Sequence, residues 1–186
     1  MSVVGVVLAG GEGRRMGGEK AMAELDGTAL LLHPLRALAA VTGTQAVVAK
    51  RDTRLPALPP GVEVWLEPDT PRHPLTGILH ALRAAAGRPV LCCAVDLPRL
   101  DPPTLQALLD AGDGREACVV ARVAGALEPL CALWRPGALP RLEACAPTPR
   151  MRDVVIALGA LEVTFADARP FANANAPRDL RRLQSG

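Results

Sequence analysis

A glycine-rich, basic segment directly after the first apolar run is where this sequence could do chemistry. Residues 3–8 are apolar and rich in valine, which is typical of a buried strand, and residues 9–20 then read AGGEGRRMGGEK. Glycines let backbone N–H groups turn toward an anion because no Cβ atom intervenes. The groups that could bind a polyphosphate are three glycines and three basic residues, Gly10, Gly11, Gly13, Arg14, Arg15 and Lys20.

Two well-known phosphate loops do not fit this segment. A P-loop needs Gly-Lys-Ser/Thr at its end, but Gly18 is followed by Glu19, and Lys20 is followed by Ala21. The dinucleotide-binding fingerprint needs a glycine where Met16 stands. The segment therefore predicts a phosphate-binding loop of another kind.

A carboxylate follows the second strongly apolar run of the chain. Residues 90–95 are continuously apolar, which is typical of a strand buried on both faces of a parallel sheet, and the run ends on Asp96. Ligands of open α/β sheets bind at the carboxyl ends of the strands, so Asp96 would face the same crevice as the loop after Leu8. A carboxylate there suits Mg²⁺. The alternative is a helix cap, although Asp101 is better placed for that role.

The two asparagines of the chain stand close together near its end. Asn173 and Asn175 are separated by one residue in an extended segment, so their side chains would face the same side. A turn and a helix cap before Pro177 is the alternative reading. A second basic pair, Arg150 and Arg152, could face an anionic substrate or be solvated surface charge.

Composition narrows the class of protein. The chain has 186 residues, of which 49% are hydrophobic, so it can bury one substantial core and we expect a single domain over residues 1–186. A net charge of +2 and an aromatic content of 2% disfavour binding to nucleic acid or a membrane. The five cysteines lack paired C-x-x-C spacing, which predicts reduced core thiols of a cytoplasmic protein. The first apolar run lacks a basic flank and is predicted to be a strand rather than a signal peptide.

The remaining chain alternates strand and helix signals. Strands are expected over residues 3–8, 46–49, 62–66, 90–95, 117–121, 130–134 and 161–165. A short extended piece and a turn are expected over residues 23–28. A helix capped by Thr28 is expected over residues 29–40, and further helices over residues 75–86, 102–111, 137–144, 151–157 and from Pro177 onward. This pattern predicts a three-layer α/β/α fold around a mostly parallel sheet.

Four stretches together resemble the signature of a known enzyme superfamily. They are Leu8-Ala9-Gly10-Gly11 with Arg15-Met16-Gly17 and Lys20, then Pro74-Leu75-x-Gly77, then Asp96-Leu97-Pro98, and finally Phe171-x-Asn173-x-Asn175-x-Pro177-x-Asp179-Leu180. The chain resembles the nucleotidyltransferases, and most closely the molybdenum cofactor guanylyltransferases of the MobA type. This resemblance implies a Rossmann-like sheet of the nucleotide-diphospho-sugar transferase type.

The resemblance also implies a reaction. Enzymes of this family transfer GMP from GTP to the terminal phosphate of molybdenum-molybdopterin, giving molybdopterin guanine dinucleotide and pyrophosphate, with Mg²⁺ as cofactor. The second pKa of a phosphate monoester is about 6, so the nucleophile is mostly dianionic at neutral pH and needs no general base. Catalysis would then be positioning plus charge neutralisation. Transient contact with molybdoenzymes or other cofactor-biosynthesis proteins is also expected.

By the same resemblance, roles are expected for particular residues. The catalytic group would be Lys20, Arg15 and Asp96. The nucleotide would be bound by Leu8, Ala9, Gly10, Gly11, Gly13, Lys20, Asp69, Pro74, Leu75, Gly77 and Asp96. The alignment across Glu67-Pro68-Asp69 leaves open whether Asp69 or a neighbour makes this contact, and a solvated loop charge is the alternative for Asp69. The metal would be bound by Asp96 and Asn175, and the pterin substrate by Asn173 and Asn175.

The sequence departs from the family pattern at two places. His73 replaces the first glycine of the family's Gly-Pro-Leu-Ala-Gly segment, and the family's nucleotide-contacting asparagine near residues 47–50 is missing or replaced by Lys50. Two other functions therefore stay open. One is a transferase for CTP or another nucleotide, such as a molybdopterin cytidylyltransferase or a sugar- or alcohol-phosphate nucleotidyltransferase. The other is a non-catalytic nucleotide-binding delivery module.

Overall fold

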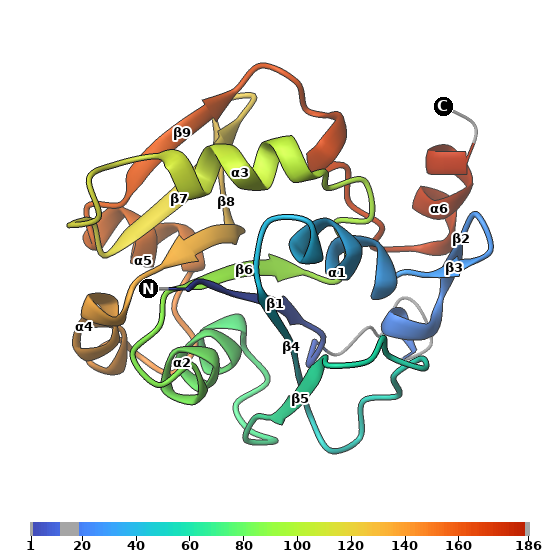
Figure 1. Ribbon diagram of the computed structural model, residues 1–186, viewed down its shortest axis with the longest axis horizontal. Coiled ribbons are helices and arrows are strands. Elements are labelled where there is room, and N and C mark those ends of the chain that lie inside the picture. The colour runs from blue at the N-terminus through green and yellow to red at the C-terminus, as the bar shows by residue number, and fades with distance from the viewer. Residues whose placement is uncertain (1, 12–18, 185–186) are drawn as a thin grey trace.

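The computed structural model describes residues 2–11 and 19–184, and its centre is a seven-stranded sheet (Figure 1). The strands in chain order are β1 (Val4–Leu8), β4 (Thr44–Ala49), β5 (Glu63–Leu66), β6 (Val90–Ala94), β7 (Cys118–Val123), β8 (Ala126–Trp134) and β9 (Leu161–Phe165). Their order across the sheet is β5-β4-β1-β6-β8-β7-β9. Strand β8 is antiparallel to both of its neighbours, and the other pairs are parallel. The mostly parallel sheet is confirmed.

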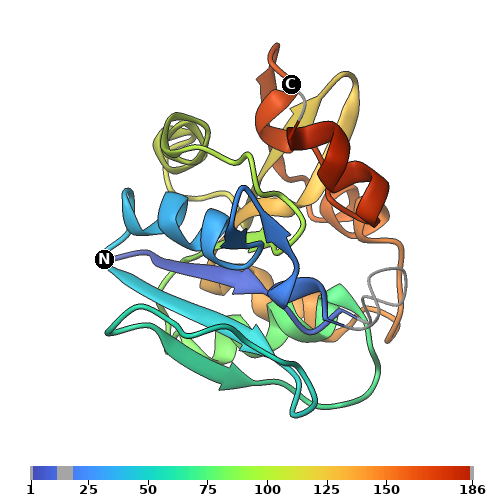
Figure 2. The ribbon, with the colours of Figure 1, turned by 90° about the vertical axis from the view of Figure 1, so that its right-hand side faces the viewer.

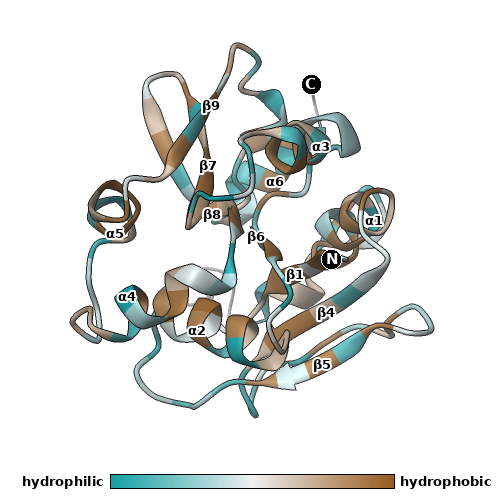
Figure 3. Ribbon diagram, turned by 60° about the vertical axis from the view of Figure 1, so that its left-hand side comes forward, coloured by the Kyte–Doolittle hydropathy of each residue, from teal (hydrophilic) through white to brown (hydrophobic). Residues whose placement is uncertain are grey.

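Helices cover both faces of this sheet. They are α1 (Leu32–Ala39), α2 (Pro74–Ala84), α3 (Pro102–Asp110), α4 (Leu139–Glu143), α5 (Met151–Ala157) and α6 (Pro177–Gln184). Side chains of successive strand residues point to opposite faces, so Val7 packs with α1 and α3 while Val6 packs with α2, α4 and α5. Strands β1 and β6 are apolar along most of their length (Figure 3), as expected for strands with both faces covered. The three layers are confirmed.

The parallel strands bring their carboxyl ends to one edge. Figure 2 shows the arrowheads of β1, β4 and β5 pointing the same way, and Leu8 at the end of β1 pairs with Ala94 at the end of β6. The loops that follow these two strands therefore start side by side. They carry Gly10, Gly11 and Asp96, so the fold brings the glycine-rich segment and the carboxylate to one place.

The predicted start of the first helix is wrong. Thr28 and Ala29 form strand β3 (Thr28–Ala29), which pairs with β2 (Glu24–Leu25), and α1 begins only at Leu32 without a side-chain cap. The reason is Asp26-Gly27, whose φ angles of 51° and 71° close a tight two-residue hairpin. Leu25 of this hairpin packs with Leu30, and α6 covers that small cluster through Leu180 and Leu183.

Strand β8 is longer than predicted, because it begins at Ala126 rather than at Leu130. Ala124 and Gly125 have φ angles of 47° and 80°, which again suit a tight hairpin, and they join β7 directly to β8. The helix prediction for residues 102–111 is confirmed, with Asp101 accepting a hydrogen bond from the Thr104 amide at 2.9 Å. None of the helices in the described ranges is long and apolar enough to cross a bilayer.

Gly5 in the middle of β1 lets α1 pack directly against the sheet. A Cβ atom on Gly5 would lie 2.6 Å from Thr42 Oγ1 and 3.0 Å from Leu38 Cβ. We expect Gly5→Ala to lower the free energy of unfolding by about 1–3 kcal/mol, because the added methyl group would be forced into a buried, already filled space beside Thr42 and Leu38. Urea unfolding measures the change. Gly43→Ala is the matched control because a Cβ there meets nothing within 4 Å, and equal midpoints for the two variants would contradict the prediction.

Candidate active site

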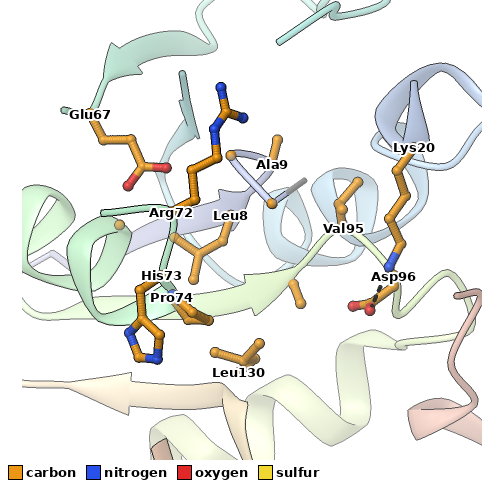
Figure 4. Close-up of a pocket in the computed structure, with 14 residues that line it drawn as sticks. Leu8, Ala9, Lys20, Glu67, Arg72, His73, Pro74, Val95, Asp96 and Leu130 are labelled. Atoms are coloured by element: carbon orange, nitrogen blue, oxygen red, sulfur yellow. Dashed lines mark hydrogen bonds and ion pairs between the residues drawn. The ribbon is translucent and has the colours of Figure 1, made fainter. Parts of the chain in front are cut away.

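A cavity of about 230 Å³ lies where β1 and β6 end and α2 begins (Figure 4). Its walls come from five stretches of chain that the fold brings together. The lining residues are Leu8, Ala9, Gly10, Gly11, Lys20, Glu67, Arg72, His73, Pro74, Gly77, Ala94, Val95, Asp96 and Leu130. Figure 4 shows Glu67 and Arg72 on one side of this cavity and Lys20 with Asp96 on the other.

Lys20, Asp96 and Asn175 meet at one end of the cavity. The Lys20 ammonium donates hydrogen bonds to Asp96 Oδ2 and to Asn175 Oδ1, each at 2.8 Å. The side chains of Lys20 and Asp96 are 17% and 18% exposed, so the ion pair is largely shielded from water. The Ala174 amide also donates to the Asp96 carbonyl at 2.9 Å, which ties the last extended segment to the end of β6. These contacts join Lys20 to Asp96, which is 76 residues away in the sequence, and to Asn175, which is 155 residues away.

A buried lysine and glutamate lie at the opposite end. Lys50 is 1% exposed, donates a hydrogen bond from Nζ to the Pro68 carbonyl at 2.5 Å, and lies 3.4 Å from Glu67 Oε1. Glu67 Oε2 is buried and accepts no hydrogen bond within the part of the chain that the structure describes. Burial raises the pKa of Glu67, although the charge of Lys50 opposes this shift. Within the described residues Oε2 of Glu67 is therefore an unused acceptor, buried behind the cavity wall that Glu67 helps to form.

Two glycines make room for this carboxylate. A Cβ atom on Gly10 would lie 1.9 Å from Glu67 Oε1, and one on Gly77 would lie 3.3 Å from Glu67 Oε2 and 3.0 Å from Leu8 Cδ2. Any larger residue at position 10 would displace the glutamate. The close approach of Glu67 is therefore a second physical reason for glycine at these positions, beside access to an anion.

His73 begins helix α2 where a glycine was expected. Its Nδ1 accepts a hydrogen bond from the Leu75 amide at 3.2 Å, and Pro74 occupies the first turn. Burial lowers the pKa of His73, which favours the neutral ring that this acceptor role requires. The histidine therefore stabilises the helix and also lines the cavity.

A second cavity of about 360 Å³ adjoins the first. It is lined by Ala94, Asp96, Leu97, Glu128, Pro129, Leu130, Arg150, Met151, Arg152 and Asn173, and so shares Ala94, Asp96 and Leu130 with the first cavity. Neither Arg150 nor Arg152 forms a side-chain ion pair within the described residues. Burial, and then the charge of Asp96, raises the pKa of Glu128. Asp96 thus lies between two cavities, and the second is lined by two arginines that have no ion-pair partner among the described residues.

Comparison with known proteins agrees with this geometry. The sequence profile described as the MobA-like NTP transferase domain matches residues 5–162. The chain belongs to this family. A molybdenum cofactor guanylyltransferase of Cereibacter sphaeroides is 38% identical over all of this chain and 97% of its own length. One of Rhodobacter capsulatus is 34% identical over 99% and 96% of the two chains.

Solved structures show the same fold. A crystal structure of molybdopterin-guanine dinucleotide biosynthesis protein A from Archaeoglobus fulgidus superposes on this MobA-like chain with a TM-score of 0.79, at 23% identity, covering 98% and 97% of the two chains. A Mycobacterium tuberculosis protein crystallised in complex with manganese has a TM-score of 0.75 at 20% identity, covering 100% and 99% of the two chains. The nucleotidyltransferase fold predicted from the sequence is confirmed.

The structure places most of the residues that the MobA resemblance singled out. Seven of them line the first cavity, namely Leu8, Ala9, Gly10, Gly11, Lys20, Pro74 and Gly77, and Asp96 lines both cavities. Asn173 lines the second cavity, and Asn175 binds Lys20. Leu75 is 2% exposed in the core, and Asp69 is exposed away from the cavity walls. Gly13 and Arg15 lie outside the described residues, and all these roles stay predictions.

The sequence analysis named Asp69 or a neighbour as the nucleotide contact and gave no role to Arg72, whereas the charged residues on one side of the first cavity are Arg72 and Glu67. Asp69 fits the family pattern as well as Glu67 does in Glu67-Pro68-Asp69, so spacing alone does not choose between them. The family's asparagine contact was expected to be missing or replaced by Lys50. The Lys50 ammonium is buried against Glu67, and Lys50 does not line the first cavity. The available signal was that Lys50 is one of only two lysines in the chain.

The residues around Asp96 suit a hard divalent cation. The described residues contain no cluster of three or more His, Cys, Asp or Glu side chains that could hold a metal ion. A Mg²⁺ site needs fewer protein ligands than this, since the ion is commonly held by one or two protein oxygens together with water and substrate phosphates. Asp96 Oδ2 and Asn175 Oδ1 already converge on the Lys20 ammonium, which shows that the two oxygens can surround a cation.

Proposed function

We propose that this MobA-like protein transfers GMP from GTP to the terminal phosphate of molybdenum-molybdopterin, forming molybdopterin guanine dinucleotide and pyrophosphate. The observation that carries the proposal is that two cavities meet at Asp96, one with the glycine-rich segment and one with free arginines. A donor and an acceptor bound in these cavities would bring their reacting phosphates together at that carboxylate. Relatives that align over the whole chain are molybdenum cofactor guanylyltransferases.

The charges of the first cavity orient the nucleotide. Lys20 lies at the end next to Asp96, so the phosphates belong there, with Gly11, Gly13 and Arg15 as further donors. Gly10 lies against Glu67 and would contact the nucleotide nearer its base. The base then lies toward Glu67 (Figure 4). An ionised carboxylate only accepts hydrogen bonds, and guanine offers it two adjacent donors, N1–H and the 2-amino group. Adenine and cytosine place an acceptor beside their amino group, and uracil has a single N–H between two carbonyls. Glu67 therefore favours GTP.

Group transfer at Asp96 needs positioning more than acid–base chemistry. An oxygen of the acceptor phosphate forms a bond to the α-phosphorus, and the bond from that phosphorus to the bridging oxygen breaks, so that pyrophosphate leaves. The acceptor is already a dianion near neutral pH, with a second pKa of about 6. Asp96 and Asn175 would hold Mg²⁺, which supplies charge neutralisation at the phosphates. Lys20 neutralises the charge of the leaving pyrophosphate and orients the triphosphate for in-line attack.

The acceptor occupies the second cavity. Its phosphate approaches Asp96 through the shared wall, and Arg150 and Arg152 supply positive charge around an otherwise anionic molecule. Asn173 lines this cavity, so it is placed to hydrogen-bond the pterin. We place the reaction in the cytoplasm because all five cysteines are free thiols, which a reducing compartment preserves. Transient docking onto molybdoenzymes or cofactor-biosynthesis proteins is compatible with this role.

Calorimetry with GTP, CTP, ATP and UTP in the presence of Mg²⁺ tests the proposal. GTP should bind most tightly, and Lys20→Ala should weaken binding about tenfold or more because a charge-assisted contact to phosphate is lost. Arg83→Ala is a matched control, since Arg83 is an exposed cation paired with Glu143 far from the cavity. Preference for CTP would instead indicate a cytidylyltransferase. GTP binding without pyrophosphate release in the presence of molybdopterin would indicate a non-catalytic module.

A further inference from the structure

The Lys20 ammonium lies where a metal ion would lie. Its two hydrogen bonds, to Asp96 Oδ2 and Asn175 Oδ1, are both 2.8 Å long and use the oxygens that are proposed to hold Mg²⁺. An ammonium group and a divalent cation cannot both occupy this position, because like charges this close repel strongly. Lys20 therefore has two possible partners, the metal ligands in the free protein and the phosphates in the complex.

The backbone on both sides of this contact is anchored. Lys20 begins a short 3₁₀ helix (Lys20–Met22) in which Ala21 is buried, and the Met22 amide donates to the Glu19 carbonyl at 2.9 Å. On the other side, the Asn175 and Ala176 amides donate to Asp179 Oδ2 at 3.0 and 2.9 Å. Only the flexible lysine side chain has to move for the site to open.

We propose that Lys20 fills the cation position of the free protein, so that the site binds a divalent metal weakly on its own and more tightly together with nucleotide. A triphosphate offers the ammonium a stronger partner, so it draws Lys20 away from Asp96 while carrying the metal in. This inference rests on the proposed function for the identity of the nucleotide. It gives Lys20 a role beyond phosphate binding, as a competitor of free metal.

The proposal makes metal and nucleotide binding cooperative. Free metal must displace a positive charge from Asp96, so its affinity for the free protein is reduced. Nucleotide removes that competition, and by linkage metal must strengthen nucleotide binding by the same factor. If Lys20 bound only phosphate, its removal would leave the affinity for free metal unchanged.

Titration of the protein with Mn²⁺ alone tests this competition, with free Mn²⁺ measured by its electron paramagnetic resonance signal. Lys20→Met keeps the length of the side chain without its charge, and should bind Mn²⁺ about tenfold more tightly than the wild type. The same variant should bind the Mn²⁺–GTP complex more weakly. Adding Asp96→Asn to Lys20→Met should abolish the gain, since the metal ligand is lost.

Controls separate this result from a general charge effect and from misfolding. Arg83→Ala removes an exposed positive charge far from the site and should leave Mn²⁺ affinity unchanged. Lys20→Gln provides a second neutral side chain and should repeat the gain. Unchanged or weaker Mn²⁺ binding in both Lys20 variants would overturn the proposal. Because this titration contains no nucleotide, its failure is distinct from failure of the GTP assignment, which the calorimetric comparison of nucleotides reports.

Discussion

Asp96→Asn is expected to lower the rate of pyrophosphate release about 10²- to 10³-fold, the usual effect of removing one group that stabilises charge in the transition state. Asparagine keeps the shape of the side chain but removes the charge that holds a divalent cation between the two cavities. The only hydrogen bond that the Asp96 carboxylate makes within the described chain is the one from Lys20, so the fold should persist. Initial rates at saturating GTP, molybdenum-molybdopterin and Mg²⁺ measure the loss.

A nearby aspartate provides the matched control. Asp101 caps helix α3 through the Thr104 amide and does not line either cavity at Asp96. Asparagine is also a good helix cap, so Asp101→Asn should keep nearly full activity and stability. Wild-type turnover in Asp96→Asn at saturating Mg²⁺ would show that Asp96 is not the metal ligand.

Glu67→Gln is expected to weaken GTP binding about tenfold or more, because a charged acceptor for two N–H groups is replaced by an amide with one acceptor and one donor. Affinity for CTP should change little, so selectivity between the two nucleotides should shrink. Calorimetry with both nucleotides measures this. Glu63→Gln, an exposed carboxylate on β5, is the control.

The same glutamate should make GTP binding depend on pH. Glu67 must be ionised to accept both donors, and burial raises its pKa above the usual 4.5. GTP affinity should therefore fall as the pH is lowered toward that raised pKa, and Glu67→Gln should lack this part of the dependence. Lys50→Met combined with Glu67→Gln leaves no unpaired buried charge, so it keeps the test usable if the single variant is unstable. Identical pH profiles for wild type and variant would exclude Glu67 from base recognition.

Local pattern was enough to predict most of the fold. Continuous apolar runs identified the central strands, and a carboxylate at the end of one of them placed Asp96 at the binding edge. The turn at Asp26-Gly27 was predicted, but the first helix was expected to start too early. Thr28 and Ala29 instead pair as the second strand of the hairpin, which a turn signal alone does not reveal.

The Lys50–Glu67 pair was beyond sequence reasoning for a different reason. The two residues meet because β4 and β5 pair in parallel, with Ala49 opposite Leu66, so that the residues after both strands lie together. That register is a property of the assembled sheet. The position of Glu67 under Gly10 likewise depends on three strands being in place, whereas the glycine signature itself was visible in the sequence.

The antiparallel strand β8 separates two stretches of the chain that line different cavities. Apart from residues 94–97 and Leu130, the first cavity, proposed to bind the nucleotide (the nucleotide cavity), is lined by residues 8–77. The second cavity, proposed to bind the acceptor (the acceptor cavity), is lined by residues 128–173. Substitutions in the second stretch can therefore reshape the acceptor cavity without altering a wall of the nucleotide cavity. Acceptor specificity can therefore change through substitutions in residues 128–173, while the residues of the nucleotide cavity stay unchanged.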